Sequence, residues 1–117
     1  MTGPTLNELC EHIRSFRDAR DWEQFHTLKD LAAAIAVEAA ELQEILLWQQ
    51  VDGEADLLAR RRAEIEAELA DVFIQVANFA LAADVDLRNA VMRKLAENEI
   101  KYPVDKARGR ATKYTDL

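Results

Sequence analysis

Apolar residues recur along most of this chain at steps of three and four, the spacing of helices that bury one face. No stretch shows the strict alternation of apolar and polar residues typical of a half-buried strand. The pattern predicts four helices, over residues 6–19, 28–50, 55–83 and 86–102, followed by an extended tail from about residue 103 to 117. We therefore expect an all-α protein.

The predicted helix ends coincide with residues that favour such ends. Thr5, Thr27 and Asp86 precede three of the helices, and their side-chain oxygens can cap the free backbone N–H groups of a first turn. Gly53 separates the second helix from the third, and Pro103 disfavours helix in the residue before it. The boundaries therefore support the helical assignment independently of the apolar spacing.

Helical phase shows which polar side chains share a face with the apolar ones. On the second helix, Glu38 falls in the middle of the apolar face and Glu41 falls beside it. On the third helix a polar ridge follows the apolar face, and it consists of Glu64, Glu68, Asp71, Gln75 and Asn78. On the fourth helix, Lys94 and Asn98 lie within the apolar face, and Tyr102 continues their line. These three helices thus direct polar groups toward one interior.

The carboxylates of this interior indicate a bound cation. Two carboxylates about 4 Å apart repel by about 4 kcal/mol at an effective dielectric constant of 20. Four of them, Glu38, Glu41, Glu68 and Asp71, would be very unfavourable together without a positive charge. Oxygen ligands without His suit Mg²⁺, with Mn²⁺ as an alternative, and Mg²⁺ commonly shares its coordination with phosphate oxygens. We therefore expect a phosphate-bearing substrate.

Composition narrows the class of protein further. The 117 residues suit one domain, 1–117, and half of them are apolar. With 22 acidic and 15 basic residues, the net charge is −7, which disfavours binding to a nucleic acid polymer. No segment resembles a signal peptide, and the most apolar stretch, 69–83, is too short and too polar to span a membrane. We expect a soluble cytoplasmic protein.

The third predicted helix is apolar nearly all round after Leu69. Such a helix is usually buried on several sides. Because a chain of this length has little material to cover it, we expect a homo-oligomer, and the sequence leaves dimer and tetramer both open.

The carboxylate pattern resembles that of the MazG-like family of nucleoside triphosphate pyrophosphohydrolases. The family motif, Glu-x-x-Glu, a gap and Glu-x-x-Asp, reads here Glu38-Ala-Ala-Glu41, 26 residues and Glu68-Leu-Ala-Asp71. The resemblance extends over nearly the whole chain to the dCTP pyrophosphatase branch. The segments that carry it are Arg20 to His26, Leu42 to Trp48, the set Lys94, Asn98 and Tyr102-Pro103, and Lys113 to Leu117.

This resemblance implies a MazG-like bundle of four to five helices, completed by homo-oligomerisation. It implies Mg²⁺-dependent hydrolysis of a (deoxy)nucleoside triphosphate, dCTP or a modified dCTP among the candidates, to the monophosphate and pyrophosphate. The metal ligands would be Glu38, Glu41, Glu68 and Asp71. Glu41 lies on the flank of the apolar face rather than in its middle, so we expect it to act also as the general base.

The substrate contacts are likewise implied by the resemblance. Trp22 and Trp48 would line the base pocket with His26 beside them, and Lys94, Asn98 and Tyr102 would contact the phosphates or the sugar. In relatives that prefer dCTP a His is expected near position 13, where this chain has Ile13 next to His12.

Two other functions remain open at this stage. A non-enzymatic helical interaction module would use the apolar third helix to bind a partner protein, and its carboxylates would be incidental. A di-metal carboxylate oxidase is less favoured, because that class uses Glu-x-x-His on two helices and neither motif here contains a His.

Overall fold

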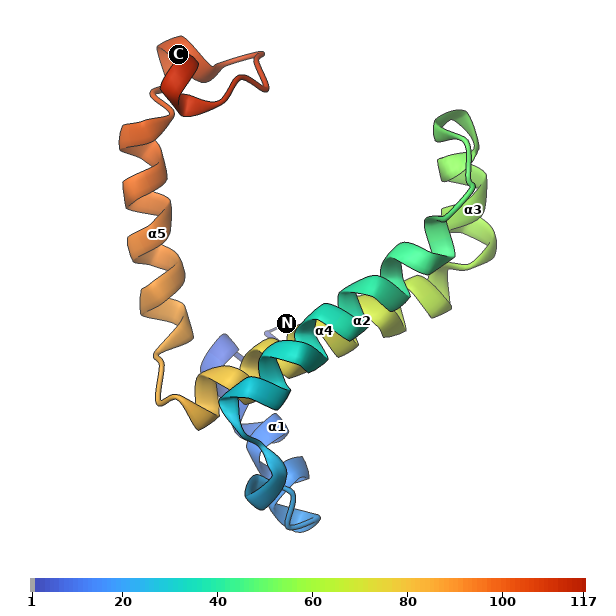
Figure 1. Cartoon of the computed structure of the whole chain (residues 1–117), viewed down its shortest axis with the longest axis vertical. Helices are drawn as coiled ribbons and strands as arrows, with labels where there is room; N and C mark the ends of the chain where they lie inside the picture. The colour runs from blue at the N-terminus through green and yellow to red at the C-terminus, as the bar shows by residue number, and fades with distance from the viewer. Residues whose placement is uncertain (1) are drawn as a thin grey trace. The chain divides into compact units, whose positions relative to one another are not determined.

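The computed structural model describes residues 2–117, and this part of the chain is helical without strands (Figure 1). Its α-helices are α1 (Leu6–Ala19), α2 (Leu28–Leu46), α3 (Glu54–Arg60), α4 (Arg62–Ala82), α5 (Leu87–Lys101) and α6 (Val104–Ala107). Single 3₁₀ turns cover Glu23–Phe25, Val51–Gly53 and Tyr114–Asp116. The prediction of an all-α protein is confirmed.

The predicted capping residues begin three of the helices. Thr5, Thr27 and Asp86 each accept a hydrogen bond from the backbone N–H three residues further on, at 3.2, 3.2 and 3.0 Å. At the other end of α5, Lys101 is the last helical residue, and Pro103 follows two residues later. Local side-chain chemistry therefore sets these ends, as the sequence indicated.

Three predicted boundaries are wrong. Helix α2 ends at Leu46 rather than at residue 50, because Leu47 turns to extended backbone and Trp48 has a positive φ of 67°. The predicted helix over 55–83 is two helices, interrupted at Arg61 (φ −119°, ψ 26°). The tail predicted as extended contains α6 and the turn Tyr114–Asp116.

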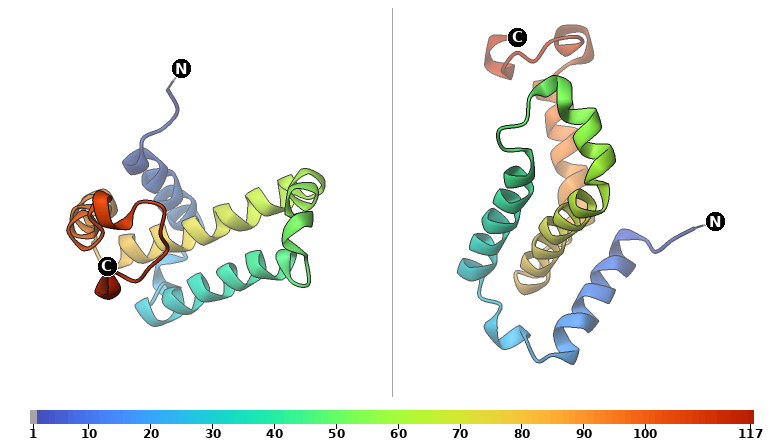
Figure 2. Two further views of the ribbon diagram at one scale, coloured as in Figure 1. Left: turned by 90° about the horizontal axis from the view of Figure 1, so that it is seen from above. Right: turned by 90° about the vertical axis from the view of Figure 1, so that its right-hand side faces the viewer.

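The chain forms two compact units, one ending at Val85 and the other comprising Asp86–Leu117. In the first unit α2 packs along α4, and α1 and α3 also contact α4; Figure 2 shows α2 and α4 side by side. The buried apolar side chains of this unit are Leu31, Ile45, Leu57, Ala77 and Ala80. Two of the five are alanines of α4, whose small side chains allow neighbouring helices to approach closely.

In the second unit the end of the chain folds back on the end of α5. The rings of Tyr102 and Tyr114 meet edge to face with centroids 5.9 Å apart. The Lys101 ammonium lies 5.0 Å from the centroid of the Tyr114 ring, within the range of a cation–π contact.

Candidate active site

Helices α2 and α4 bring the predicted carboxylates together. The pairs Glu38/Glu41 and Glu68/Asp71 are each three residues apart, so each pair occupies one face of its helix. Carboxylate oxygens of Glu38, Glu41 and Glu68 all lie within 4.8 Å of one another. Asp71 is outside this group of three, but its charge helps to raise the pKa of both Glu38 and Glu68. Asp71 is therefore within electrostatic reach of the other carboxylates.

Burial and like charge both disfavour ionisation in this cluster. Burial is the largest cause of the raised pKa of Glu38 and of Glu68, followed by a hydrogen bond with Glu41 and the charges of neighbouring carboxylates. The Oε2 atoms of Glu38 and Glu68 are buried without a hydrogen-bond partner in residues 2–117. An unpaired buried acceptor is costly, and a cation among these oxygens would relieve that cost. The donor set therefore fits a divalent metal ion.

An ion pair borders the cluster on the side where α4 begins. Arg61 Nε donates to Glu64 Oε2 at 2.7 Å, and this contact holds the pKa of Glu64 below its ordinary value. A cavity of about 400 Å³ lies here, lined by Glu41, Glu44, Ile45, Arg61, Glu64 and Glu68. Arg61 was not among the predicted site residues, although its spacing of three from Glu64 is a helical ion-pair signal.

A second cavity, of about 230 Å³, adjoins the carboxylates through Asp71. Its walls come from α1, the connector to α2, and α4, and they consist of Ile13, Phe16, Arg17, Trp22, His26, Asp71, Ile74, Gln75 and Asn78. Trp22 and His26, both predicted to contact the base, thus lie in one cavity. Because the charge of Asp71 also acts on Glu38 and Glu68, the cavity lies next to the acidic cluster.

In the connector between α1 and α2, Trp22 contacts the end of α1, and the His26 N–H donates to the Glu23 carbonyl at 3.0 Å. The Arg17 carbonyl accepts a hydrogen bond from the Trp22 N–H at 3.1 Å, and the rings of Phe16 and Trp22 meet edge to face at 5.8 Å. Burial is the largest cause of the lowered pKa of His26, and the charge of Arg17 lowers it further against the opposing effect of Glu23. His26 is therefore neutral near pH 7.

The other predicted substrate residues are not brought into this cavity. Trp48 follows the end of α2 and is 90% exposed. Lys94, Asn98 and Tyr102 lie on or next to α5 in the second unit, where Lys94 pairs with Glu97 at 3.4 Å. Their roles toward a substrate stay predictions.

Comparison with known proteins places this architecture among known families. The model of the MazG-like family matches residues 33–117. The chain is 39% identical over 116 residues to dCTP pyrophosphatase 1 of Bos taurus, covering 97% of this chain and 69% of that protein. It is 40% identical over 117 residues to dCTP pyrophosphatase 1 of Rattus norvegicus, covering 97% and 68%. A crystal structure of a pyrophosphatase from Archaeoglobus fulgidus superposes with a TM-score of 0.80 at 41% identity, covering 88% of this chain and 96% of that one.

The helical fold shared with the archaeal pyrophosphatase, together with the similarity to dCTP pyrophosphatase 1, defines a hydrolase, a nucleoside triphosphate pyrophosphatase. The chain belongs to the MazG-like family, and within it to the branch that resembles dCTP pyrophosphatase 1. The interaction module and the carboxylate oxidase left open by the sequence are therefore set aside. No helix in residues 2–117 is long and apolar enough to cross a membrane.

Proposed function

We propose that this pyrophosphatase hydrolyses deoxynucleoside triphosphates, with dCTP or a modified dCTP as substrate, to the monophosphate and pyrophosphate, and so removes excess or modified nucleotides. The observation that carries the proposal is that Asp71 lines a base-sized cavity and acts electrostatically on Glu38 and Glu68, two members of a carboxylate cluster that fits a metal ion. The curated relatives named dCTP pyrophosphatase 1 support the choice of nucleotide.

In this proposal the metal is Mg²⁺, with Mn²⁺ as a substitute, held by Glu38, Glu41, Glu68 and Asp71. A bound divalent ion neutralises negative charge that develops on the phosphate oxygens during cleavage. The unpartnered Oε2 atoms of Glu38 and Glu68 are the donors best suited to hold it, since they have no competing hydrogen bond in the described chain.

Glu41 is the proposed general base. It is the exposed member of the three clustered carboxylates, whereas Glu38 and Glu68 are half-buried. An exposed carboxylate oxygen can contact solvent and take a proton from the attacking water. The same exposure lets a triphosphate approach the cluster from outside.

Trp22 and His26 are proposed to contact the base, because both line the cavity next to Asp71. Stacking of a base on an aromatic ring contributes about 1–3 kcal/mol and is tolerant of base identity. Trp48 is assigned to the same base and Lys94, Asn98 and Tyr102 to the phosphates or sugar. The ammonium of Lys94 would offset part of the triphosphate charge.

Product identification tests the reaction. The protein is incubated with each of the four common deoxynucleoside triphosphates and Mg²⁺, and products are resolved by ion-exchange chromatography. We expect monophosphate and pyrophosphate, with dCTP among the substrates that are hydrolysed fastest. Release of the diphosphate with orthophosphate would contradict the proposed position of cleavage.

Substitution of single carboxylates tests the metal site. Glu38→Gln and Asp71→Asn are expected to lower kcat/KM for dCTP by at least about tenfold, because each removes a charged oxygen ligand. Glu66→Gln is the matched control, since Glu66 is an exposed glutamate of the same helix that pairs with Arg62. A loss below tenfold in both site variants, or an equal loss in the control, would refute the assignment.

A further inference from the structure

The cavity next to Asp71 has the size and walls of a site for one aromatic ring. Its volume of about 230 Å³ is below the roughly 300–1,000 Å³ of pockets that hold whole drug-sized ligands. Ile13, Phe16, Trp22 and Ile74 supply apolar wall. Two polar side chains also line it while being almost fully buried, Arg17 at 4% and Asn78 at 7% exposure. Buried polar groups are normally hydrogen-bonded, so those that line a ligand-sized cavity are suited to form hydrogen bonds with a ligand.

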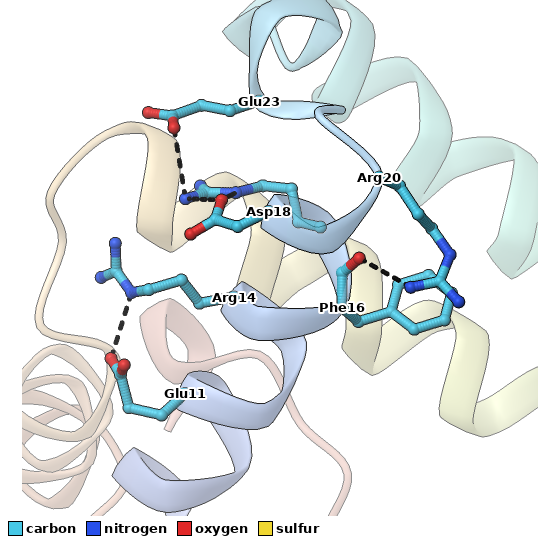
Figure 3. Close-up of polar contacts among 7 residues, drawn as sticks. Glu11, Arg14, Phe16, Asp18, Arg20 and Glu23 are labelled. Carbon is cyan, nitrogen blue, oxygen red and sulfur yellow. Dashed lines mark hydrogen bonds and ion pairs between the residues drawn. The ribbon is translucent and has the colours of Figure 1, made fainter.

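Arg17 offers hydrogen-bond donors to this cavity. Its Nε donates to Asp18 Oδ1 at 2.8 Å, and its Nη2 lies 2.8 Å from the same oxygen and 3.6 Å from Glu23 Oε2; Figure 3 shows Asp18 and Glu23 at these ion pairs. These contacts use Nε and Nη2 of a guanidinium that also lines the cavity. A guanidinium has no acceptor and does not lose its proton, so Arg17 presents only donors to a ligand.

Asn78 supplies a hydrogen-bond acceptor, in contrast to the donors of Arg17. Its Nδ2 donates to Gln75 Oε1 at 3.4 Å, a contact that directs the amide nitrogen toward its own helix neighbour. Its Oδ1 is buried and has no hydrogen-bond partner in the described part of the chain. Asn78 thus lines the same cavity as Arg17 and carries an unpaired acceptor, whereas Arg17 carries only donors.

We propose that Arg17 and Asn78 determine base specificity by reading the polar edge of an aminopyrimidine, an inference that rests on the proposed function of this cavity as the base site. Arg17 Nη1 donates to the ring nitrogen of the base that carries no hydrogen, and Asn78 Oδ1 accepts from its exocyclic amine. Cytosine has this order of groups. Thymine and uracil have a carbonyl oxygen in place of the amine and an N–H in place of the ring acceptor, so donors would face donors and acceptors would face acceptors.

A site built around such pairs rejects a base that leaves them unmade, because a buried donor or acceptor then stays unpaired. Stacking on Trp22 supplies affinity for any base, whereas Arg17 and Asn78 supply the discrimination. Ile13, in the position where dCTP-preferring relatives are expected to have a His, lines the same cavity and adds only apolar surface. Arg17 and Asn78 are therefore the residues proposed to recognise the polar groups of the base.

The experiment measures kcat/KM with Mg²⁺ for three substrates: dCTP, dTTP and the deoxynucleoside triphosphate of 2-pyrimidinone, which lacks the exocyclic amine. We expect the wild-type protein to prefer dCTP over each of the others by at least about tenfold. Asn78→Leu should abolish the preference for dCTP over the 2-pyrimidinone nucleotide, to within about threefold. Arg17→Met should lower the ratio of dCTP to dTTP by at least about tenfold.

Arg14→Met is the matched control, because Arg14 lies on the same helix and pairs with the exposed Glu11. The control should leave every substrate ratio unchanged. A purely structural role of Arg17 or Asn78 would lower kcat/KM equally for all three substrates, and that result would overturn the inference. Circular dichroism verifies that each variant folds. If a variant does not fold, the wild-type protein alone still tests the inference. A ratio near one between its kcat/KM values for dCTP and for the 2-pyrimidinone nucleotide would show that the exocyclic amine is not recognised, and would overturn the inference.

Failure of this inference is distinguishable from failure of the proposed function. A wild-type protein that releases pyrophosphate from no deoxynucleoside triphosphate contradicts the proposed function itself. A wild-type protein that releases pyrophosphate, but prefers dTTP or keeps its preference in both site variants, contradicts only the roles given to Arg17 and Asn78.

Discussion

The carboxyl groups of Glu38 and Glu68 couple the stability of the protein to pH. Their pKa values are raised above 4.5 in the folded chain, mainly by burial. The metal-free folded state thus binds more protons than the unfolded chain above that pH. The stability that these two groups contribute is present below pH 4.5 and is lost as pH rises through their raised pKa values.

Glu38→Gln should therefore stabilise the metal-free protein at pH 7 and change its melting temperature little at pH 4. Mg²⁺ should raise the melting temperature of the wild type at pH 7, because an ion at 100 times its Kd contributes about 2.7 kcal/mol. The variant should gain much less from Mg²⁺. Differential scanning calorimetry of both proteins at the two pH values measures these differences. A variant as sensitive to Mg²⁺ as the wild type would contradict the role of Glu38.

Some residues of the candidate site could be predicted from their position in the sequence and others could not. The spacing of three within Glu38/Glu41 and within Glu68/Asp71 places each pair on one helical face whatever surrounds it. Arg17 gave no such signal, because an arginine on an amphipathic helix is usually exposed. Its burial depends on the packing of α1 against α4 and on the turn that follows α1.

At the scale of elements, the start of α2 depends on one side chain. Thr27 Oγ1 accepts the Asp30 N–H at 3.2 Å, which satisfies one of the free donors of the first turn. Thr27→Ala should lower the free energy of unfolding by about 1 kcal/mol. Thr27→Ser keeps a hydroxyl group and should lose only a small part of that amount. Urea titration followed by circular dichroism measures both. Equal losses in the two variants would show that the hydroxyl group is not the cause.

The helix boundaries show the limit of apolar periodicity as a predictor of elements. The apolar spacing continues across Arg61, so the break between α3 and α4 leaves no trace in the pattern. The capped ends at Thr5, Thr27 and Asp86 were predictable, because a cap involves residues only three positions apart. The end of α2 at Leu46 involves no such capping side chain, and it was not predictable.

At the scale of the whole molecule, we infer assembly from the apolar side chains that remain exposed in the single chain. Val37, Leu47 and Leu69 in the first unit are 55–57% exposed, and Met92 and Ile100 in the second are 61% and 81% exposed. Large apolar side chains exposed on several helices are typical of a subunit surface. We propose that copies of this chain bury them in a homo-oligomer.

Size-exclusion chromatography with light scattering should give a mass of two or four chains at micromolar concentration. The mass should stay constant on dilution over about a tenfold range, as expected for an interface that completes the fold. A mass equal to one chain would refute the assembly without affecting the assignment to the MazG-like family, which depends on sequence similarity.

The sequence by itself determined what depends on neighbours along the chain. These features are the helical class, the caps and the pairing of carboxylates at a spacing of three on α2 and α4. Only the tertiary structure decided which faces meet. It brought Glu38, Glu41 and Glu68 within 4.8 Å of one another, and it enclosed Arg17 and Asn78 with Trp22 in one cavity. The reason is physical: helical phase defines the direction of a side chain around its own axis, but what the side chain meets depends on contacts between helices far apart in the sequence.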